Sequence, residues 1–530
     1  MSLIVSYDIG STTCKVCVYR FGTTLELLGE SSTGYGLVET PNGGIEQDPD
    51  DWWQAMASAT GDALASSRVH ADEVRGIAFC AQMQGLVLVD RDLKPVRPAM
   101  SYMDQRAGAQ REHALGRGVR IAGMNARILA HSMAINGAVA ASVKDPVWKY
   151  KWVEEHEPER FGRVHRWLDV KDYAVARATG VCTMTEDSAF PTFLTDQRRG
   201  KTRWSPTLLR LYGVNPDHMP TIIRSWDVAG LLLPGPATEL GLPAGTPVFG
   251  GGGDASMIAL GAGASRPGDT YVYTGTSGWV SVTVEKRTVD VGHRIAAIVG
   301  AQPGRYHFFG EQETAGKCLE WVKDHLALDE IDLYLSREHV AASPESRYRS
   351  LYDFLIETIS QVPAGAGGVI FAPWLHGNRA PFEDEYARGV FFNIGLTTGK
   401  RMMIRAVVEG IIFHQKWLLE SARKHFRTSD PVRFTGGGAL SPVVAQIMAD
   451  VFETPVETLA NPVNSGTAGA ALTAARGLGF ISDYDEARAS IPTDRVYTPA
   501  PSHAAVYRRH YDVFKRLYPA NRKLFRMLNG

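Results

Sequence analysis

The order of apolar and polar residues along the chain predicts a mixed α/β protein. Short apolar or β-branched runs bounded by glycine or polar turns predict strands, and apolar residues three or four positions apart predict helices. The expected strands include residues 4–7, 15–19, 74–80 and 86–89. The expected helices include residues 49–66, 146–153, 166–178 and 255–261, and a further helix that starts at Ser441 and Pro442. The first of these helices has Asp48 as its cap and Pro49 at its first position.

The same strand-turn-strand pattern occurs near the start of each half of the chain. The first copy covers residues 4–19 and the second residues 270–283, and both turns are rich in glycine and hydroxyl side chains. The repeat is visible in the pattern and not in residue identity. We therefore expect two duplicated domains, at 1–249 and 250–530, with the Pro- and Gly-rich stretch 200–247 carrying the connection.

The first turn, Asp8 to Thr13, has the composition of a phosphate-binding site. Gly10 lets the backbone approach a phosphate closely, and Ser11, Thr12 and Thr13 supply hydroxyl and amide donors. Asp8 can hold a hydrated magnesium ion. An Asx turn that closes a hairpin is the alternative, and it explains Asp8 and Gly10 but not three consecutive hydroxyls.

Asp254 follows four glycines at the end of an expected strand and is the predicted catalytic base. Transfer of a phosphoryl group to an alcohol needs alignment, charge neutralisation and a carboxylate near the attacking hydroxyl. The glycines at 250–253 remove side-chain bulk before this carboxylate, and the following helix start favours its ionised form. The alternative is that Asp254 only caps its helix.

A third glycine element, residues 436–438, precedes the helix that starts at Ser441. Gly437 and Gly438 would let a flat adenine or ribose lie close to the backbone, although a simple packing turn between strand and helix is the alternative. Residues 310–318 nearly match a Walker loop, but five residues separate the two glycines where four are required. Cys318 also replaces the magnesium-binding hydroxyl, so we interpret this segment as a helix start.

Composition excludes several other classes of protein. The 56 Lys and Arg residues balance 57 Asp and Glu residues, without a long basic run, which makes nucleic acid an unlikely partner. No stretch approaches the ~20 apolar residues of a membrane helix, and no signal peptide is visible, so we expect a cytoplasmic protein. Cys14 and Cys17 should point to opposite faces of a strand, which argues against a zinc or redox pair.

Together these residues resemble the FGGY carbohydrate kinases, and the resemblance covers nearly the whole chain. The matching segments are 8–13, 82–85, 102–106, 149–152, 157–159, 253–254, 275–277, 374–381, 387–389, 405–410 and 436–441. The resemblance implies an actin-like, ribonuclease H-like ATPase fold with ATP and Mg²⁺ in a cleft between two duplicated domains. It implies nucleotide contacts from Asp8, Gly10, Ser11, Thr12, Thr13, Lys15, Gly275, Thr276, Gly437 and Gly438. It implies Asp254 as the base, with Asp8 and Asp254 holding Mg²⁺ through water, and a possible homodimer.

The resemblance also implies sugar contacts from Gln82, Met83, Gln84, Asp104 and Arg106, together with Asp254. Within the family the pattern is most similar to xylulose kinases, where histidine usually stands at the position of Gln84. Glutamine can donate to a sugar hydroxyl but cannot become cationic, so the sugar could be D-xylulose, ribulose, another ketose or a polyol.

Two alternatives remain open at this stage. Asp104 and Arg106 could form a surface ion pair without touching the sugar. The whole chain could be an actin-like ATPase switch without a sugar substrate, but such a switch needs no polar sugar contacts. Domain closure would assemble the site if Gln84 came from one domain and Asp254 from the other.

Overall fold

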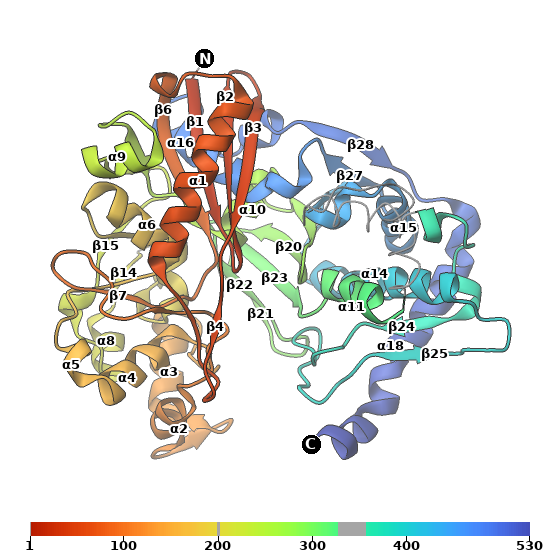
Figure 1. The fold of residues 1–530 in the computed structure, drawn as a ribbon. Helices are drawn as coiled ribbons and strands as arrows, with labels where there is room; N and C mark the ends of the chain where they lie inside the picture. The colour runs from red at the N-terminus through yellow and green to blue at the C-terminus, as the bar shows by residue number, and fades with distance from the viewer. Residues whose placement is uncertain (1, 199–201, 327–356) are drawn as a thin grey trace. The chain divides into compact units, whose positions relative to one another are not determined.

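The computed structural model describes residues 2–198, 202–326 and 357–530. The chain divides into two compact units, each built from three segments. Unit 1 contains Met1–Ser265, Ile298–Tyr306 and Asn464–Pro492, and unit 2 contains Arg266–Ala297, His307–Val463 and Thr493–Gly530. Figure 1 shows the path of the chain by colour, and each unit is described by itself below.

A twisted sheet of seven strands forms the centre of unit 1. Its strands lie in the order β16-β17-β6-β1-β2-β3, and β18 also pairs with β6. The bounds are Val228–Leu231 (β16), Pro247–Phe249 (β17), Val74–Ala81 (β6), Ser2–Ile9 (β1), Thr13–Phe21 (β2), Leu25–Gly34 (β3) and Gly252–Gly253 (β18). The strands expected at 4–7, 15–19 and 74–80 are therefore confirmed.

An eight-stranded sheet in the order β21-β22-β23-β20-β19-β26-β27-β28 lies almost wholly in unit 2; only the last two residues of β22 and the first residue of β23 are grouped with unit 1. The bounds are Val289–Asp290 (β21), Ile295–Val299 (β22), Tyr306–Gln312 (β23), Gly278–Val284 (β20), Thr270–Thr274 (β19), Val432–Thr435 (β26), Val456–Leu459 (β27) and Thr493–Tyr497 (β28).

The two sheets repeat one topology. The series β2-β1-β6-β17-β16 in unit 1 has the same succession of antiparallel, parallel, parallel and antiparallel pairings as β20-β19-β26-β27-β28 in unit 2. The two hydroxyl-rich turns join β1 to β2 and β19 to β20. The duplication inferred from the sequence pattern is therefore present in the strand order, with each turn at the equivalent place.

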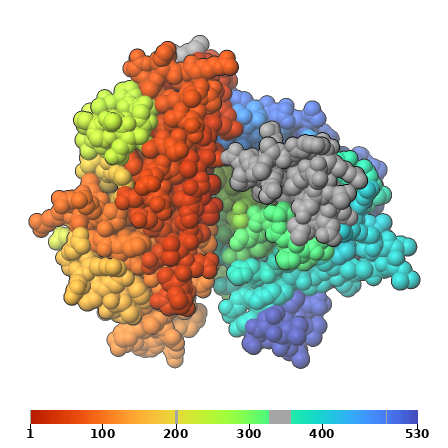
Figure 2. Space-filling view, viewed as in Figure 1, coloured from red at the N-terminus to blue at the C-terminus, as the bar shows by residue number. Residues whose placement is uncertain are grey.

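Helices cover the sheet of unit 1. Helix α1 (Pro49–Ser67) packs against β2 and β3 through an apolar face that includes Trp52 and Met56, and its outer side lies in the red and orange surface of Figure 2. Asp48 caps it by accepting a hydrogen bond from the Asp50 amide, as expected. Helix α16 (Ser465–Gly477) packs against β1 and β6.

Several element boundaries differ from the sequence expectation. Residues 166–178 form a strand, β11 (Arg166–Leu168), before helix α6 (Val170–Thr179), because β11 pairs with β7 (Val87–Val89). The stretch 200–247, where a connection was expected, belongs to unit 1 and contains helices α8 (Pro206–Tyr212) and α9 (Pro234–Leu240). The Pro and Gly residues of this stretch therefore separate short helices and strands of unit 1.

Asp254 lies in unit 1, although the sequence placed it in the second domain. It starts helix α10 (Asp254–Gly261), which packs against α16, and the unit boundary falls after Ser265. The helix stays with unit 1 because glycines bring α10 and α16 together: a Cβ at Gly469 would lie 1.9 Å from the Met257 oxygen. The expected division of Gln84 and Asp254 between two domains is thus not found.

Two further sequence expectations concern cysteines and membrane helices. All five cysteines are free, and Cys14 and Cys17 are both buried on β2. Among the described residues, the helices lack an apolar stretch of the length that a bilayer crossing requires.

Candidate active site

The carboxyl ends of three parallel strands bring the predicted residues of unit 1 together. Ala81 of β6 pairs with Ile9 of β1 on one side and with Gly253 of β18 on the other. The next residues along the three strands are the first phosphate turn, Gln82 and Asp254. Side chains at the carboxyl edge of a parallel sheet commonly bind ligands in α/β proteins.

Tyr35 and Gln47 hold the backbone oxygens of the first turn. The Tyr35 hydroxyl donates to the Gly10 oxygen at 2.6 Å, and its amide donates to the Thr12 oxygen at 2.9 Å. The Gln47 side-chain amide donates to the Ser11 oxygen at 2.9 Å. Among the described residues, the amides of Ser11 and Thr12 find no acceptor. The turn therefore presents N–H and hydroxyl donors outward, as a phosphate site requires.

Asp8 is the first residue of this turn and lies where β1 pairs with β2 and β6. Its carboxylate contacts the Cys80 thiol, and Lys15 is its antiparallel partner on β2. Burial raises the pKa of Asp8, while the charge of Lys15 and the Cys80 hydrogen bond lower it. A nearby Mg²⁺ would favour the ionised form, and Mg²⁺ is commonly held by one or two carboxylates together with phosphate oxygens and water. Asp8 therefore fits a magnesium site next to the donors of the turn.

The four glycines before Asp254 are explained by contacts within unit 1. A Cβ would lie 2.6 Å from the Arg224 oxygen at Gly250, 2.1 Å from the Phe79 oxygen at Gly251, 2.5 Å from the Met257 side chain at Gly252 and 2.4 Å from the Met83 side chain at Gly253. The four glycines thus let β18 lie against β6. Close packing within unit 1 is therefore a reason for these glycines besides space for a ligand.

Asp187 fixes the backbone immediately before Asp254. Its buried carboxylate accepts hydrogen bonds from the Gly253 amide at 2.9 Å and from the Thr185 hydroxyl at 2.6 Å. The Asp254 carboxylate accepts from the adjacent Ala255 amide at 2.7 Å, but the residue that caps α10 is Gly253, so Asp254 does not fill the capping role that the sequence left open. Asp254 is half-buried at the first turn of α10, where the helix dipole favours a negative charge.

The turn that follows β6, Gln82 to Gly85, lies beside Asp254. The Gln82 amide nitrogen donates to the Gln47 side chain at 2.8 Å, while its buried oxygen accepts no hydrogen bond within the described parts of the chain. The Met83 side chain packs on Gly253. The Gln84 side chain is partly exposed and makes no hydrogen bond with the residues the structure describes. Two amide groups next to a carboxylate suit a polyhydroxylated ligand.

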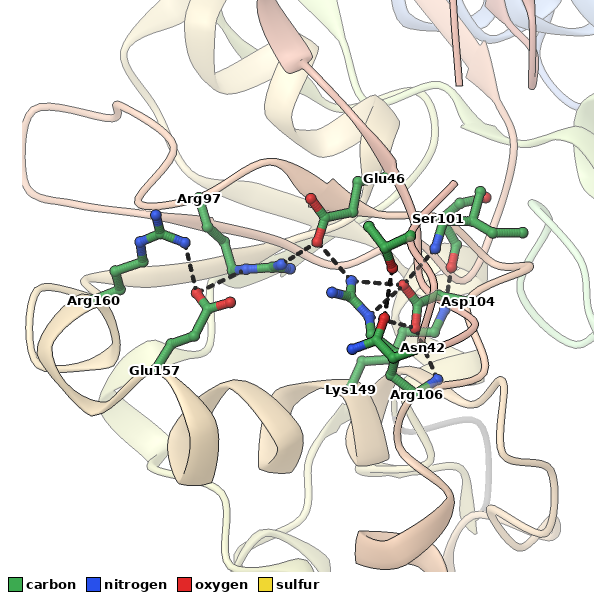
Figure 3. Close-up of polar contacts among 11 residues, drawn as sticks. Asn42, Glu46, Arg97, Ser101, Asp104, Arg106, Lys149, Glu157 and Arg160 are labelled. Atoms are coloured by element: carbon green, nitrogen blue, oxygen red, sulfur yellow. Dashed lines mark hydrogen bonds and ion pairs between the residues drawn. The ribbon is translucent and has the colours of Figure 1, made fainter. Parts of the chain in front are cut away.

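Asp104 and Arg106 belong to an internal network of charges. Asp104 is 0% exposed, and its oxygens accept from the Ile45 amide at 2.9 Å and from the Arg106 guanidinium at 2.7 Å. Figure 3 shows Glu46 between the guanidinium groups of Arg106 and Arg97. The ion pair that the sequence left as an alternative is therefore present, but it is buried and not at the surface.

The second turn lies in unit 2, and helix α11 (Gly316–His325) holds its backbone oxygens. The amide of Gly316 donates to the Gly275 oxygen at 2.8 Å, and that of Lys317 donates to the Thr276 oxygen at 3.1 Å. The segment with the near-Walker pattern is thus a helix start, as interpreted. Thr276 is exposed, and its amide finds no acceptor among the described residues. This turn repeats the arrangement of the first.

The third glycine element follows β26 in unit 2. Gly436, with φ at +87°, approaches the Thr274 oxygen so closely that a Cβ would lie 2.5 Å from it. At Gly437, in contrast, a Cβ would meet nothing within 4 Å, so packing within the described residues does not explain this glycine. Gly438 lines an apolar pocket with residues of α14 (Lys400–Arg423) and α15 (Pro442–Phe452). The open space at Gly437 would let a flat group such as a nucleoside lie close to the backbone.

Sequence reasoning missed Tyr35, Gln47 and Asp187. Each contacts a predicted segment through the fold and is distant from it along the chain, at separations of 25, 36 and 66 residues. None of them carries a local pattern that marks a binding role.

Both halves of the chain match one family description. The N-terminal domain of the FGGY family of carbohydrate kinases matches residues 3–261, and its C-terminal domain matches residues 270–478. The xylulose kinase of Bacillus subtilis (strain 168) is 29% identical over 527 residues, which cover 99% of this chain and 98% of that protein. The gluconokinase of the same organism is 24% identical and covers 97% of this chain and 95% of its own. The ligand-bound xylulose kinase structure from Lactobacillus acidophilus has a TM-score of 0.83 at 23% identity and covers 100% of both chains.

Proposed function

Because the chain belongs to the FGGY family of carbohydrate kinases, we propose that it transfers the γ-phosphoryl group of ATP to a hydroxyl of a ketose, D-xylulose or a related pentulose. Its fold is the mixed α/β, two-domain fold of that family, and its reaction class is phosphotransfer to an alcohol acceptor. Family membership rules out the ATPase switch without a sugar substrate. The identity of the sugar is the part that we propose.

The convergence of the first turn, Gln82 and Asp254 at one sheet edge carries the proposal. In this assignment the amides of Gln82 and Gln84 bind sugar hydroxyls, and the Asp254 carboxylate accepts the proton of the attacking hydroxyl. Asp187 and the Met83 contact hold the backbone before Asp254, so the base needs little reorganisation. General bases of this kind contribute about 10²–10⁴ in rate.

The two hydroxyl-rich turns are assigned to the phosphates of ATP. Outward amides of Ser11, Thr12 and Thr276 provide hydrogen bonds to phosphate oxygens, with Asp8 next to the first turn as the magnesium partner. Bound Mg²⁺ would neutralise charge that develops on the phosphoryl oxygens. The open backbone at Gly437 is assigned to the nucleoside of ATP.

The charges around the Gln82–Gly85 turn favour a neutral ketose over gluconate. A bound gluconate carboxylate needs a cationic or strong donor partner when it is desolvated. The basic side chains next to this turn and the 101–106 loop, Lys149 and Arg106, are buried and already bound to backbone oxygens or carboxylates. Gln84 offers a neutral amide instead. Ribulose, another ketose or a polyol remain the alternatives within the family.

A panel of acceptors tests this proposal. We would measure ADP release with ATP and Mg²⁺ against D-xylulose, D-ribulose, glycerol, D-gluconate and no sugar. We expect a ketose to stimulate turnover most strongly. Fastest turnover with gluconate would reassign the substrate class, and no stimulation by any ketose would refute the proposal.

A further inference from the structure

Gln84 has a backbone conformation that its side chain does not favour. Its φ is +64°, in the left-handed region that residues other than glycine rarely adopt. Such conformations cost free energy and persist where the surrounding structure determines them, often at ligand sites. The question is which groups hold this residue in place.

Asp169 binds the turn from its N–H side. This residue caps helix α6, and its oxygens accept hydrogen bonds from the Gln84 amide at 3.0 Å and from the Gly85 amide at 2.9 Å. The carboxylate is buried, and a Cβ at Gly85 would lie 2.9 Å from its oxygen. Two consecutive amides can meet one carboxylate only when the residue between them turns sharply, as Gln84 does.

Lys149 binds the same residue from its C=O side. It lies on helix α4 (Pro146–His156) and is 0% exposed. Its ammonium donates to the Gln84 oxygen at 2.9 Å and to the Ser101 oxygen at 2.7 Å, the second of which is drawn in Figure 3. No carboxylate lies within ion-pair distance of this ammonium in the described structure. Burial lowers the pKa of Lys149 to about 8 and raises that of Asp169 to about 7.

We propose that Asp169 and Lys149 are positioning residues for sugar recognition: they hold both backbone groups of Gln84 so that its unpartnered side chain stays directed at the sugar. The proposal rests on the proposed function, which assigns Gln84 to the sugar. It predicts that two buried residues outside the sugar site determine which ketose is preferred. Positioning errors of about 1 Å can cost roughly 10²-fold in rate.

Asp169→Asn is the first test variant, because it keeps the shape but replaces one acceptor oxygen by an amide that cannot accept. We expect kcat/KM for the preferred ketose to fall at least tenfold, mainly through KM, and its advantage over a second ketose to shrink. The KM for ATP should stay within twofold. Lys149→Met removes the hydrogen bonds to the Gln84 and Ser101 oxygens and should have the same signature. This variant replaces Asp169→Asn in the test if Asp169→Asn does not fold.

A double-mutant cycle with Gln84→Ala separates positioning from a general loss of stability. If Asp169 acts through Gln84, the Asp169→Asn change should cost little further in the Gln84→Ala background. Equal losses in both backgrounds would overturn the proposal, and so would Asp169→Asn and Lys149→Met variants that fold and retain the wild-type preference. Wild-type enzyme without ketose-stimulated turnover would refute the proposed function itself.

Glu409→Gln is the matched control. Glu409 is a buried carboxylate of unit 2 that binds the Arg405 guanidinium at 2.8 Å and the Gly365 amide at 3.1 Å, and it has no hydrogen bond to the Gln82–Gly85 turn. Its substitution should lower the unfolding temperature and leave the ratio of kcat/KM between two ketoses unchanged. A changed ratio in this control would mean that sugar preference reports stability alone, and would overturn the assignment.

Discussion

At the scale of single residues, the site is marked by polar groups that the protein leaves unused. Neighbouring side chains bind the carbonyl oxygens of the first turn, whereas its Ser11 and Thr12 amides find no acceptor among the described residues. The Gln82 side-chain oxygen is likewise buried without a donor there. Buried polar groups without partners are costly, so a ligand that supplies the missing partners gains affinity from them.

Asp254→Asn tests the assignment of the base. Asparagine keeps the size and the hydrogen bond from the Ala255 amide but cannot accept a proton, so turnover should fall by at least ~10². ATP affinity, measured by calorimetry, should change little. Asp62→Asn, an exposed substitution of the same chemistry on α1, is the control. Near-normal turnover of Asp254→Asn would reject the role.

The sequence could predict the residues that carry a local pattern, and not those that act through distant contacts. Asp8, Gly10 and the hydroxyls after it stand in one short turn, so composition alone indicated a phosphate site. Asp169 lies 85 residues from Gln84, and its role depends on where α6 begins, beside the turn. The local spacing of residues in the sequence does not indicate a contact between such distant residues.

At the scale of elements, the repeated topology explains why the predicted turns recur at equivalent places. The turn after β6 holds Gln82, and the turn after β26 holds Gly437, so the two equivalent strands carry different ligand assignments. The expected hairpins and glycine turns depend on local sequence patterns, and the structure contains them. The strand β11 was missed because its pairing with β7, and not its own sequence, decides between strand and helix.

Two buried histidines of unit 2 make its stability depend on pH. His307 is buried on β23, and His414 of α14 donates from Nε2 to the Ala380 oxygen at 2.7 Å. Burial lowers the pKa of both to about 4, below the 6.5 of an unfolded chain. The unfolded chain therefore binds more protons between these values, and stability should fall as pH falls from 6.5 to 4. Each histidine contributes up to about 3 kcal/mol to this loss.

Thermal unfolding between pH 7 and 4.5 measures this effect. His414→Gln retains a donor for the Ala380 oxygen and should reduce the loss of unfolding temperature on acidification. His70→Gln, at an exposed position of unit 1, is the control and should follow the wild type. An identical pH dependence in His414→Gln and wild type would show that burial of His414 does not produce the effect.

At the scale of the whole molecule, unit 1 is assembled from segments far apart in sequence. Residues 464–492 belong to unit 1 although they follow most of unit 2 in the sequence. They include α16, which packs against β1, β6 and α10. The sequence pattern therefore predicts the domain boundary before Asp254. The packing of α16 against α10, which keeps α10 in unit 1, is a contact between distant segments and leaves no local pattern in the sequence.

Gly469→Ala tests this long-range packing. A Cβ at Gly469 would lie 1.9 Å from the Met257 oxygen, so α16 and α10 must separate to accept it. Overpacking of this kind costs about 1–3 kcal/mol, and a shift of α10 also moves Asp254. We expect a lower unfolding temperature together with lower ketose-stimulated turnover. Gly61→Ala in α1 is the control, since its Cβ would meet nothing within 4 Å and alanine favours the helix by roughly 0.5–1 kcal/mol. Equal unfolding temperatures for Gly469→Ala and the wild type would contradict the proposed role of α16 in holding the catalytic helix.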